Sequence, residues 1–328
     1  MRQPLLIKAL LVAFALTACG GEDQPSEPDE PAAGGAPANI AVSSGDNQRI
    51  VVGGQLLAPL QARVTNAQGG GVSGVTVTWE VTEGGGQLST TSTTTNTSGQ
   101  ASVVFTAGPS TGANTITATV SDVSGAATFN AVAVEPSGIA TVGGDHQEVR
   151  AGVSLAEELQ ARVTASDNGP VPGATVQFEV TSGDGALAAG MATTDADGRA
   201  SVDLTAGSSV GAITVTASPA GSSASTTFDI DVSAPVSVTV TMENIAFNAP
   251  GGGDDVVIML GDTVRWVNND AVQHTATSTD TPAGGNAFDS GFLSQAQDFE
   301  FVPNTRGAWT YFCRVHPAQM RDARITVN

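Results

Sequence analysis

The chain contains a long internal repeat, and this repeat constrains the fold more than any other feature of the sequence. The segment Leu60–Thr65, with the sequence LQARVT, returns unchanged as Leu159–Thr164. A few residues further on, Val75–Thr82 (VTVTWEVT) returns as Ala174–Thr181 (ATVQFEVT). Both pairs are 99 residues apart, so the two copies align without a gap. A repeat at fixed spacing indicates a structural unit that occurs more than once, and duplication of one domain is the prediction.

Each copy, residues 39–134 and residues 138–232, has the pattern of a β-sandwich. Alternating apolar residues such as Val75, Val77 and Trp79 mark short strands, and Gly-rich turns separate them. About seven such strands in roughly a hundred residues are typical of this architecture. The composition agrees, because Gly, Thr, Val and Ala are abundant and long helix-forming residues are few.

A family resemblance follows from the second copy. The run VPGATVQF at 171–178, followed by TTDADGRA at 193–200, resembles bacterial immunoglobulin-like domains of the invasin and intimin type. The resemblance implies an Ig-like β-sandwich for both copies. It also implies a role as a rigid spacer or adhesive module, and no catalytic residue carries over from it.

The duplication also allows isolated residues to be compared with their counterparts. His146 aligns with Asn47, which favours a solvent-facing histidine over a metal ligand. The tetrapeptide DADG at 195–198 suggests a calcium loop, but its counterpart at 96–99 is NTSG. Both form turns readily, so hairpin turns are the prediction at these two positions.

Residues 236–328 differ from the repeats and contain a group of soft metal ligands. His274 lies in a loop after an expected strand, and Cys313 follows a later expected strand, with His316 and Met320 in one short loop behind it. One thiolate and two imidazoles in a near-trigonal plane, with a distant thioether, form the blue-copper arrangement. Softness of the donors selects copper over calcium or magnesium. Zinc remains chemically possible, although structural zinc sites usually contain more cysteines.

The same region has a second family resemblance. The segments GDTVRWVNND at 261–270, FDSG at 288–291 and WTYFCRVHP at 309–317 resemble cupredoxins of the plastocyanin and amicyanin type. The resemblance implies a Greek-key β-sandwich, one type 1 copper ion and the transfer of single electrons.

This resemblance also assigns the ligands. It implies that His274, Cys313 and His316 are the equatorial ligands and that Met320 is the axial one. Three residues separate His316 from Met320, where amicyanin has two and plastocyanin has four. If Met320 does not reach the metal, the site is three-coordinate or takes another weak donor. The chain has three histidines in total, too few for multicopper oxidases or copper nitrite reductases, so an electron carrier is expected rather than an enzyme.

The N-terminal residues predict export and a lipid anchor. Arg2 and Lys8 flank an apolar stretch, which is typical of a secretory signal over residues 1–18. The sequence LTAC ending at Cys19 resembles a bacterial lipobox, which implies lipidation of Cys19 and anchoring at an outer membrane, facing the periplasm or the cell surface. Residues 19–38 are mostly Gly, Pro, Ala and acids, and are therefore predicted to form a disordered tether.

Cysteine number and charge limit the partners. The chain has two cysteines, Cys19 and Cys313, so a lipidated Cys19 leaves no disulfide. Cys313 is then either a buried spectator or a metal ligand. The formal net charge of −20 at pH 7 argues against nucleic acid as a partner. A redox protein, such as a cytochrome or another electron carrier, is expected instead.

Taken together, these features predict an all-β protein with two tandem Ig-like β-sandwiches followed by a cupredoxin Greek-key β-sandwich. The first functional hypothesis is a membrane-anchored blue-copper protein that carries single electrons, with the Ig-like domains as a spacer. The second is a surface adhesin or copper-sequestering lipoprotein in which copper is structural or stored.

Overall fold

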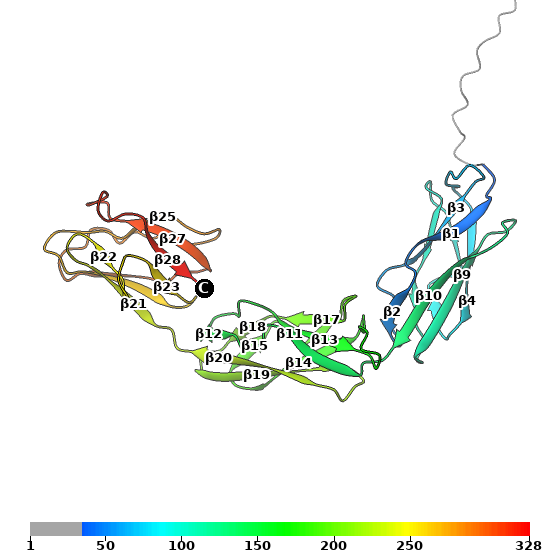
Figure 1. Ribbon diagram of the computed structural model, residues 1–328, viewed down its shortest axis with the longest axis horizontal. Coiled ribbons are helices and arrows are strands. Elements are labelled where there is room, and N and C mark those ends of the chain that lie inside the picture. Colours follow the sequence, from blue (N-terminus) through cyan, green and yellow to red (C-terminus); the bar gives the residue numbers. More distant parts are fainter. Residues whose placement is uncertain (1–34) are drawn as a thin grey trace, which may run out of the picture.

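A computed structural model describes residues 35–328 of the protein. Three β-sandwiches follow one another along the chain and lie in an open arc (Figure 1). The predicted all-β fold is confirmed. In this described part, there is no helix with the length and hydrophobicity that crossing a membrane requires. The expected signal peptide, Cys19 and most of the expected tether lie outside the described residues.

The first sandwich packs a three-stranded sheet, β1-β3-β7, against a five-stranded sheet, β2-β10-β9-β4-β6, with β5 and β8 forming a short pair. Its strands are β1 (Asn39–Ser44), β2 (Gln48–Val51), β3 (Leu60–Thr65), β4 (Thr76–Glu83), β5 (Gln87–Leu88), β6 (Ser92–Thr94), β7 (Gln100–Val103), β8 (Phe105–Thr106), β9 (Gly112–Thr119) and β10 (Ala127–Val134). Trp79 and Phe129 lie in its core, with ring centroids 5.7 Å apart.

The second sandwich repeats this topology with sheets β11-β13-β17 and β12-β20-β19-β14-β16 and the pair β15-β18. Its strands are β11 (Gly138–Gly143), β12 (Glu148–Arg150), β13 (Leu159–Thr164), β14 (Thr175–Ser182), β15 (Gly185–Leu187), β16 (Met191–Thr193), β17 (Arg199–Val202), β18 (Leu204–Ala206), β19 (Gly211–Pro219) and β20 (Thr226–Ser233). Phe178 and Phe228 replace the aromatic pair of the first core, 6.3 Å apart. Asn47 and His146 occupy equivalent turns with φ of 56° and 54°, and His146 is exposed, as the alignment predicts.

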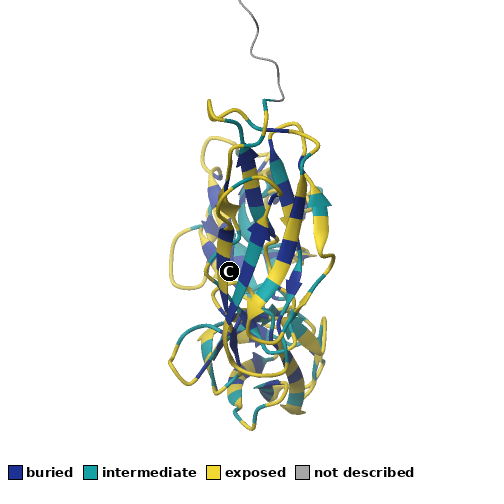
Figure 2. Cartoon of the chain, turned by 90° about the vertical axis from the view of Figure 1, so that its right-hand side faces the viewer, coloured by how far each residue is buried: buried dark blue, intermediate teal, exposed yellow. Residues whose placement is uncertain are grey.

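The third sandwich consists of two four-stranded sheets, β22-β21-β24-β26 and β23-β28-β27-β25. Its strands are β21 (Ser237–Met242), β22 (Phe247–Asn248), β23 (Val256–Ile258), β24 (Thr263–Asn268), β25 (Thr277–Asp280), β26 (Asp298–Phe301), β27 (Gly307–Phe312) and β28 (Ala323–Val327). Buried and exposed residues alternate along the strands, as Figure 2 shows for the chain. The inward face of β27 places Trp309 and Tyr311 in an aromatic core beside Trp266. Cys313 continues the same alternation one residue beyond the strand.

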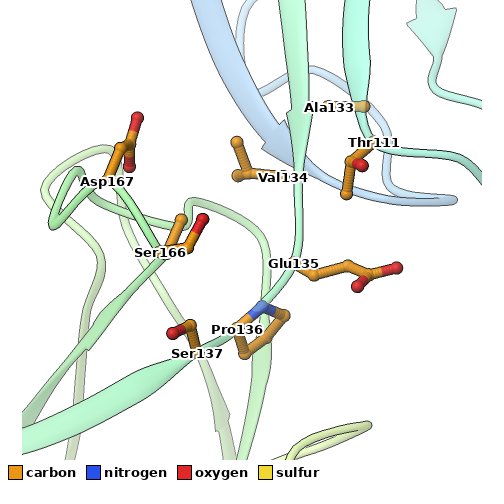
Figure 3. A pocket seen from close by; sticks show the side chains of 9 residues that line it. Thr111, Ala133, Val134, Glu135, Pro136, Ser137, Ser166 and Asp167 are labelled. Atoms are coloured by element: carbon orange, nitrogen blue, oxygen red, sulfur yellow. The ribbon is translucent and has the colours of Figure 1, made fainter.

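The first and second sandwiches meet through the end of β2. The Arg49 guanidinium forms two 2.9 Å hydrogen bonds to the carboxylate of Asp167. The Val51 amide donates to the Pro172 carbonyl across the junction at 2.9 Å. Figure 3 shows the cleft beside this contact; residues lining it include Thr111, Val134, Glu135, Pro136, Ser166 and Asp167.

The second and third sandwiches meet through the end of β12. Arg150 binds Asp262 with Nε–Oδ1 and Nη2–Oδ2 distances of 2.8 and 3.1 Å, and Asp262 is 1% exposed. Gly261 has φ of 97°, and a Cβ at this position would lie 2.8 Å from the side chain of Val153. Close packing therefore requires glycine here. Arg306, immediately before β27, also reaches across and donates to the Ser154 carbonyl at 3.1 Å.

Candidate metal centre

Three side chains from two distant loops converge at one end of the third sandwich. His274 lies in the loop between β24 and β25, and Cys313 and His316 lie in the loop between β27 and β28. The Cys313 Sγ atom is 3.7 Å from His274 Nδ1 and 3.9 Å from His316 Nδ1, and the two Nδ1 atoms are 3.2 Å apart. Among residues 35–328, this is the group of His, Cys, Asp and Glu side chains close enough together to hold a metal ion.

These separations are those expected of three donors around one ion. Metal bonds of about 2.0–2.1 Å to nitrogen and about 2.3 Å to sulfur give nitrogen-to-sulfur separations of about 3.8 Å at an angle of about 120°. The 3.2 Å between the two Nδ1 atoms corresponds to an angle of about 100°. The donor set is one thiolate and two imidazoles, which is the equatorial set of a type 1 copper site. The residues present therefore fit copper in both chemistry and spacing.

Met320 is tied to the same loop through its backbone. Its amide donates to the His316 carbonyl at 3.0 Å, and its carbonyl accepts the Cys313 amide at 2.8 Å. The side chain is 1% exposed and belongs to the same buried cluster as Cys313. The extra residue between His316 and Met320, relative to amicyanin, is thus accommodated in a tight turn. The role of Met320 as the axial ligand stays a prediction.

The Cys313 sulfur is buried and accepts a hydrogen bond. The backbone amide of Thr275, next to the ligand His274, donates to Sγ at 3.3 Å. The Arg314 amide in turn donates to Thr275 Oγ1 at 2.9 Å, which joins the two ligand-bearing loops. A hydrogen bond to the sulfur withdraws charge from a thiolate and favours the reduced state of a bound metal.

His274 is fully buried, and its outer nitrogen is held by a carboxylate. The Nε2 atom lies 2.8 Å from Oδ2 of Asp270, so the Nδ1 atom faces the other two donors. The pKa of the Asp270 carboxyl lies below its usual value, mainly because the Ile245 amide donates to it, and further because the Asn244 amide and the His274 ring do. This carboxylate is therefore held in the ionised form beside the ligand.

The other histidine connects the centre with the surface. His316 is half-buried, and its neighbours Val315, Pro317 and Ala318 are exposed. The loop lies at the end of the third sandwich that faces away from the second (Figure 1). Of the three donors, His316 is therefore the one nearest to solvent.

A cationic and aromatic patch lies beside this loop. The Phe292 ring is 61% exposed, and the Arg314 guanidinium lies over it, 5.3 Å from the ring centroid. Arg314 also pairs with Asp289 at 3.0 Å, so its charge is partly neutralised.

Several residues around the centre were not foreseen from the sequence. Asp270 and Asn268 look like ordinary turn residues, yet Asn268 is buried and its amide donates to the Val272 and Leu293 carbonyls at 2.8 Å each. Leu293 also exchanges backbone hydrogen bonds with His274. The only signal available was a carboxylate four residues before a ligand histidine.

Comparison with known proteins gives matches to the Ig-like part and to the C-terminal part of the chain. The family described as bacterial Ig-like domain (group 1) matches residues 41–133 and 139–232. Amicyanin from Paracoccus versutus is 30% identical over 80 residues, which are 24% of this chain and 58% of the relative. The chain thus spans less than two thirds of that curated relative.

Among solved structures, the D0-D1 domain of intimin is 19% identical; the match covers 59% of this chain and 97% of the intimin chain, with a TM-score of 0.26. The crystal structure of amicyanin from Paracoccus versutus is 27% identical; the match covers 28% of this chain and 81% of the amicyanin chain, with a TM-score of 0.24.

Proposed function

The chain belongs to the bacterial Ig-like domain (group 1) family, and from this premise we propose that it is a blue-copper protein in which two Ig-like domains support an electron-carrying, amicyanin-like domain. The observation that supports the proposal most strongly is the convergence of the Cys313 sulfur and two imidazole nitrogens within 4.8 Å of one another.

The residues around the centre suit transfer of single electrons. A bound type 1 copper ion supplies the redox step by changing between Cu(II) and Cu(I). Cys313 and His274 are held in the core by backbone pairing and by Asp270, so their positions are fixed by the fold. His316 connects the buried sulfur with solvent and offers the shortest route to a partner. The expected partner is a redox protein, such as a cytochrome or another electron carrier.

The test is to add Cu(II) to the purified chain and record its absorption, its EPR spectrum and its voltammetry. We expect intense absorption at about 600 nm, which is characteristic of copper–thiolate bonding, and reversible one-electron cycling. A colourless or irreversible copper complex would instead favour storage or a structural role, with adhesion as the function of the Ig-like domains.

Replacement of the thiolate gives the first prediction. Cys313→Ser should abolish the visible absorption and lower the copper affinity by about tenfold or more, because a hydroxyl is a hard, neutral donor at pH 7. His146→Ala is the matched control, since His146 is exposed and lies in the second sandwich. A blue Cys313→Ser variant would contradict the assignment.

We also propose that the protein is exported and anchored through a lipid on Cys19, with residues 19–38 as a tether. The support is the sequence of the N-terminal region alone. Cell fractionation tests it: the chain should sediment with outer membranes, and Cys19→Ala should release it. Retention of the Cys19→Ala variant in the membrane fraction would contradict the proposal.

A further inference from the structure

We propose that Asp270 is a positioning residue of the metal centre, which selects the tautomer of His274 and lowers the reduction potential of a copper ion held there. The second half of this inference rests on the proposed function; the first half concerns the protein without metal.

The Asp270 carboxylate is bound on both oxygens. Oδ1 accepts the Asn244 amide at 2.9 Å, while Oδ2 accepts the Ile245 amide at 3.0 Å and contacts His274 Nε2 at 2.8 Å. The Asp270 amide donates to the buried side chain of Asn268 at 2.9 Å. Four hydrogen bonds thus fix this side chain and its backbone, so the carboxylate meets His274 in one orientation.

The turn between β21 and β22 presents two backbone amides to Asp270. Asn244 and Ile245 both have positive φ, 56° and 55°. Two-residue hairpin turns of this kind normally take Asn-Gly, and a β-branched residue there is unusual. In some turns successive backbone N–H groups converge on one anion. Here both N–H groups meet Asp270, so the strained turn supports the carboxylate.

This arrangement determines which nitrogen of His274 carries the proton. Oδ2 already accepts the Ile245 amide, so in a neutral His274 ring Nε2 donates to this oxygen and Nδ1 keeps its lone pair. Nδ1 is the atom that faces Cys313 Sγ at 3.7 Å. A carboxylate on the far side of the ring also makes the imidazole a stronger donor and stabilises Cu(II) relative to Cu(I). The opposite ligand, His316, has a solvent-facing edge instead.

Two substitutions separate charge from hydrogen bonding. Asp270→Asn removes the charge and the Asn244 hydrogen bond but keeps one oxygen that can accept the Ile245 amide and the Nε2 proton, whereas Asp270→Ala removes every one of these interactions. Asp289→Asn is the matched control, because Asp289 pairs with Arg314 near the same loop and its carboxylate contacts Arg314 and Thr277 rather than a ligand. Thermal unfolding of each variant reports its structural cost.

The first measurement uses the full chain without metal. Nitrogen-15 NMR of the histidine rings should show His274 with its proton on Nε2 in the wild type and in Asp270→Asn, and a mixture of tautomers in Asp270→Ala. The second measurement uses the copper-loaded chain. Both Asp270 variants should have a higher reduction potential than the wild type, Asp270→Ala should bind Cu(II) about 10- to 100-fold more weakly, and Asp289→Asn should resemble the wild type.

Two outcomes would overturn the inference: an unchanged potential in both Asp270 variants, or a wild-type His274 with its proton on Nδ1. If the first is accompanied by a loss of stability, Asp270 is only an anchor for the turn. If the chain forms no blue copper complex but His274 has the expected tautomer, the proposed function fails while the positioning role of Asp270 is supported.

Discussion

Ile245 has a backbone conformation that β-branched residues rarely adopt, and this conformation has a cost in free energy. Its φ is 55°, and its side chain is 39% exposed. The left-handed region costs an L-residue about 1–2 kcal/mol, whereas glycine adopts it freely at an entropic cost of about 0.5–1 kcal/mol. The difference favours glycine.

We therefore predict that Ile245→Gly raises the free energy of unfolding of the third sandwich by about 0.5–1 kcal/mol. Because the amide that binds Asp270 is retained, the copper spectrum should not change. Urea unfolding followed by Trp fluorescence measures the first effect, and Val257→Gly, at an exposed strand position, is the control that should destabilise. Destabilisation by Ile245→Gly would show that the turn stores no strain.

At the same scale, the ligands could be predicted from the sequence and their supports could not. Cys313 and His316 are rare residue types in a recognisable spacing, and that spacing limits their chemistry. Thr275 and Asp270 act through a backbone amide and a turn carboxylate, and such groups occur throughout any chain. Only the folded structure shows that these two lie against Cys313 and His274.

At the scale of the element, β27 delivers the thiol to the metal centre. Trp309, Tyr311 and Cys313 alternate on the inward face, and all three are buried. This strand could be predicted, because the alternation is visible in the sequence. The Tyr311 hydroxyl donates to the Asp254 carbonyl at 3.1 Å. This hydrogen bond could not be predicted, because Asp254 lies in a loop 57 residues away. Burial raises the pKa of this hydroxyl, so it remains a donor at neutral pH.

Tyr311→Phe tests how far the strand and the centre are independent. The variant leaves one backbone carbonyl without its donor, and we expect a loss of about 1 kcal/mol in the free energy of unfolding. The aromatic packing is retained, so the wavelength and intensity of the copper absorption should match the wild type. Calorimetry and absorption of the loaded chain give the two values. A shifted spectrum would mean that Tyr311 acts on the centre itself.

At the scale of the molecule, the buried pair Arg150–Asp262 joins the third sandwich to the second. Removing one member of a buried, hydrogen-bonded ion pair costs about 3–5 kcal/mol, because the other charge is left without its partner. The repeat could not predict this contact, since Arg150 aligns with Val51 in the first copy.

We predict that Arg150→Ala loosens the junction and allows the third sandwich to move relative to the second. Small-angle X-ray scattering should show a wider distribution of particle dimensions, while the copper spectrum stays the same. Arg265→Ala is the control, because Arg265 pairs with Asp298 on the surface of the third sandwich. Identical scattering from Arg150→Ala and the wild type would mean that the remaining contacts suffice.

Both junctions start from the end of the same strand in the duplicated unit, β2 in one copy and β12 in the other. The contacting side chains differ, Arg49 in one copy and Arg150 in the other, but a further copy inserted between them would present the same strand end to its successor. The length of the molecule can then change by recombination in steps of one unit, while the third sandwich keeps its orientation relative to its immediate neighbour. We accordingly expect natural variants of this architecture to differ more in the number of Ig-like units than in the metal-binding residues of the third sandwich.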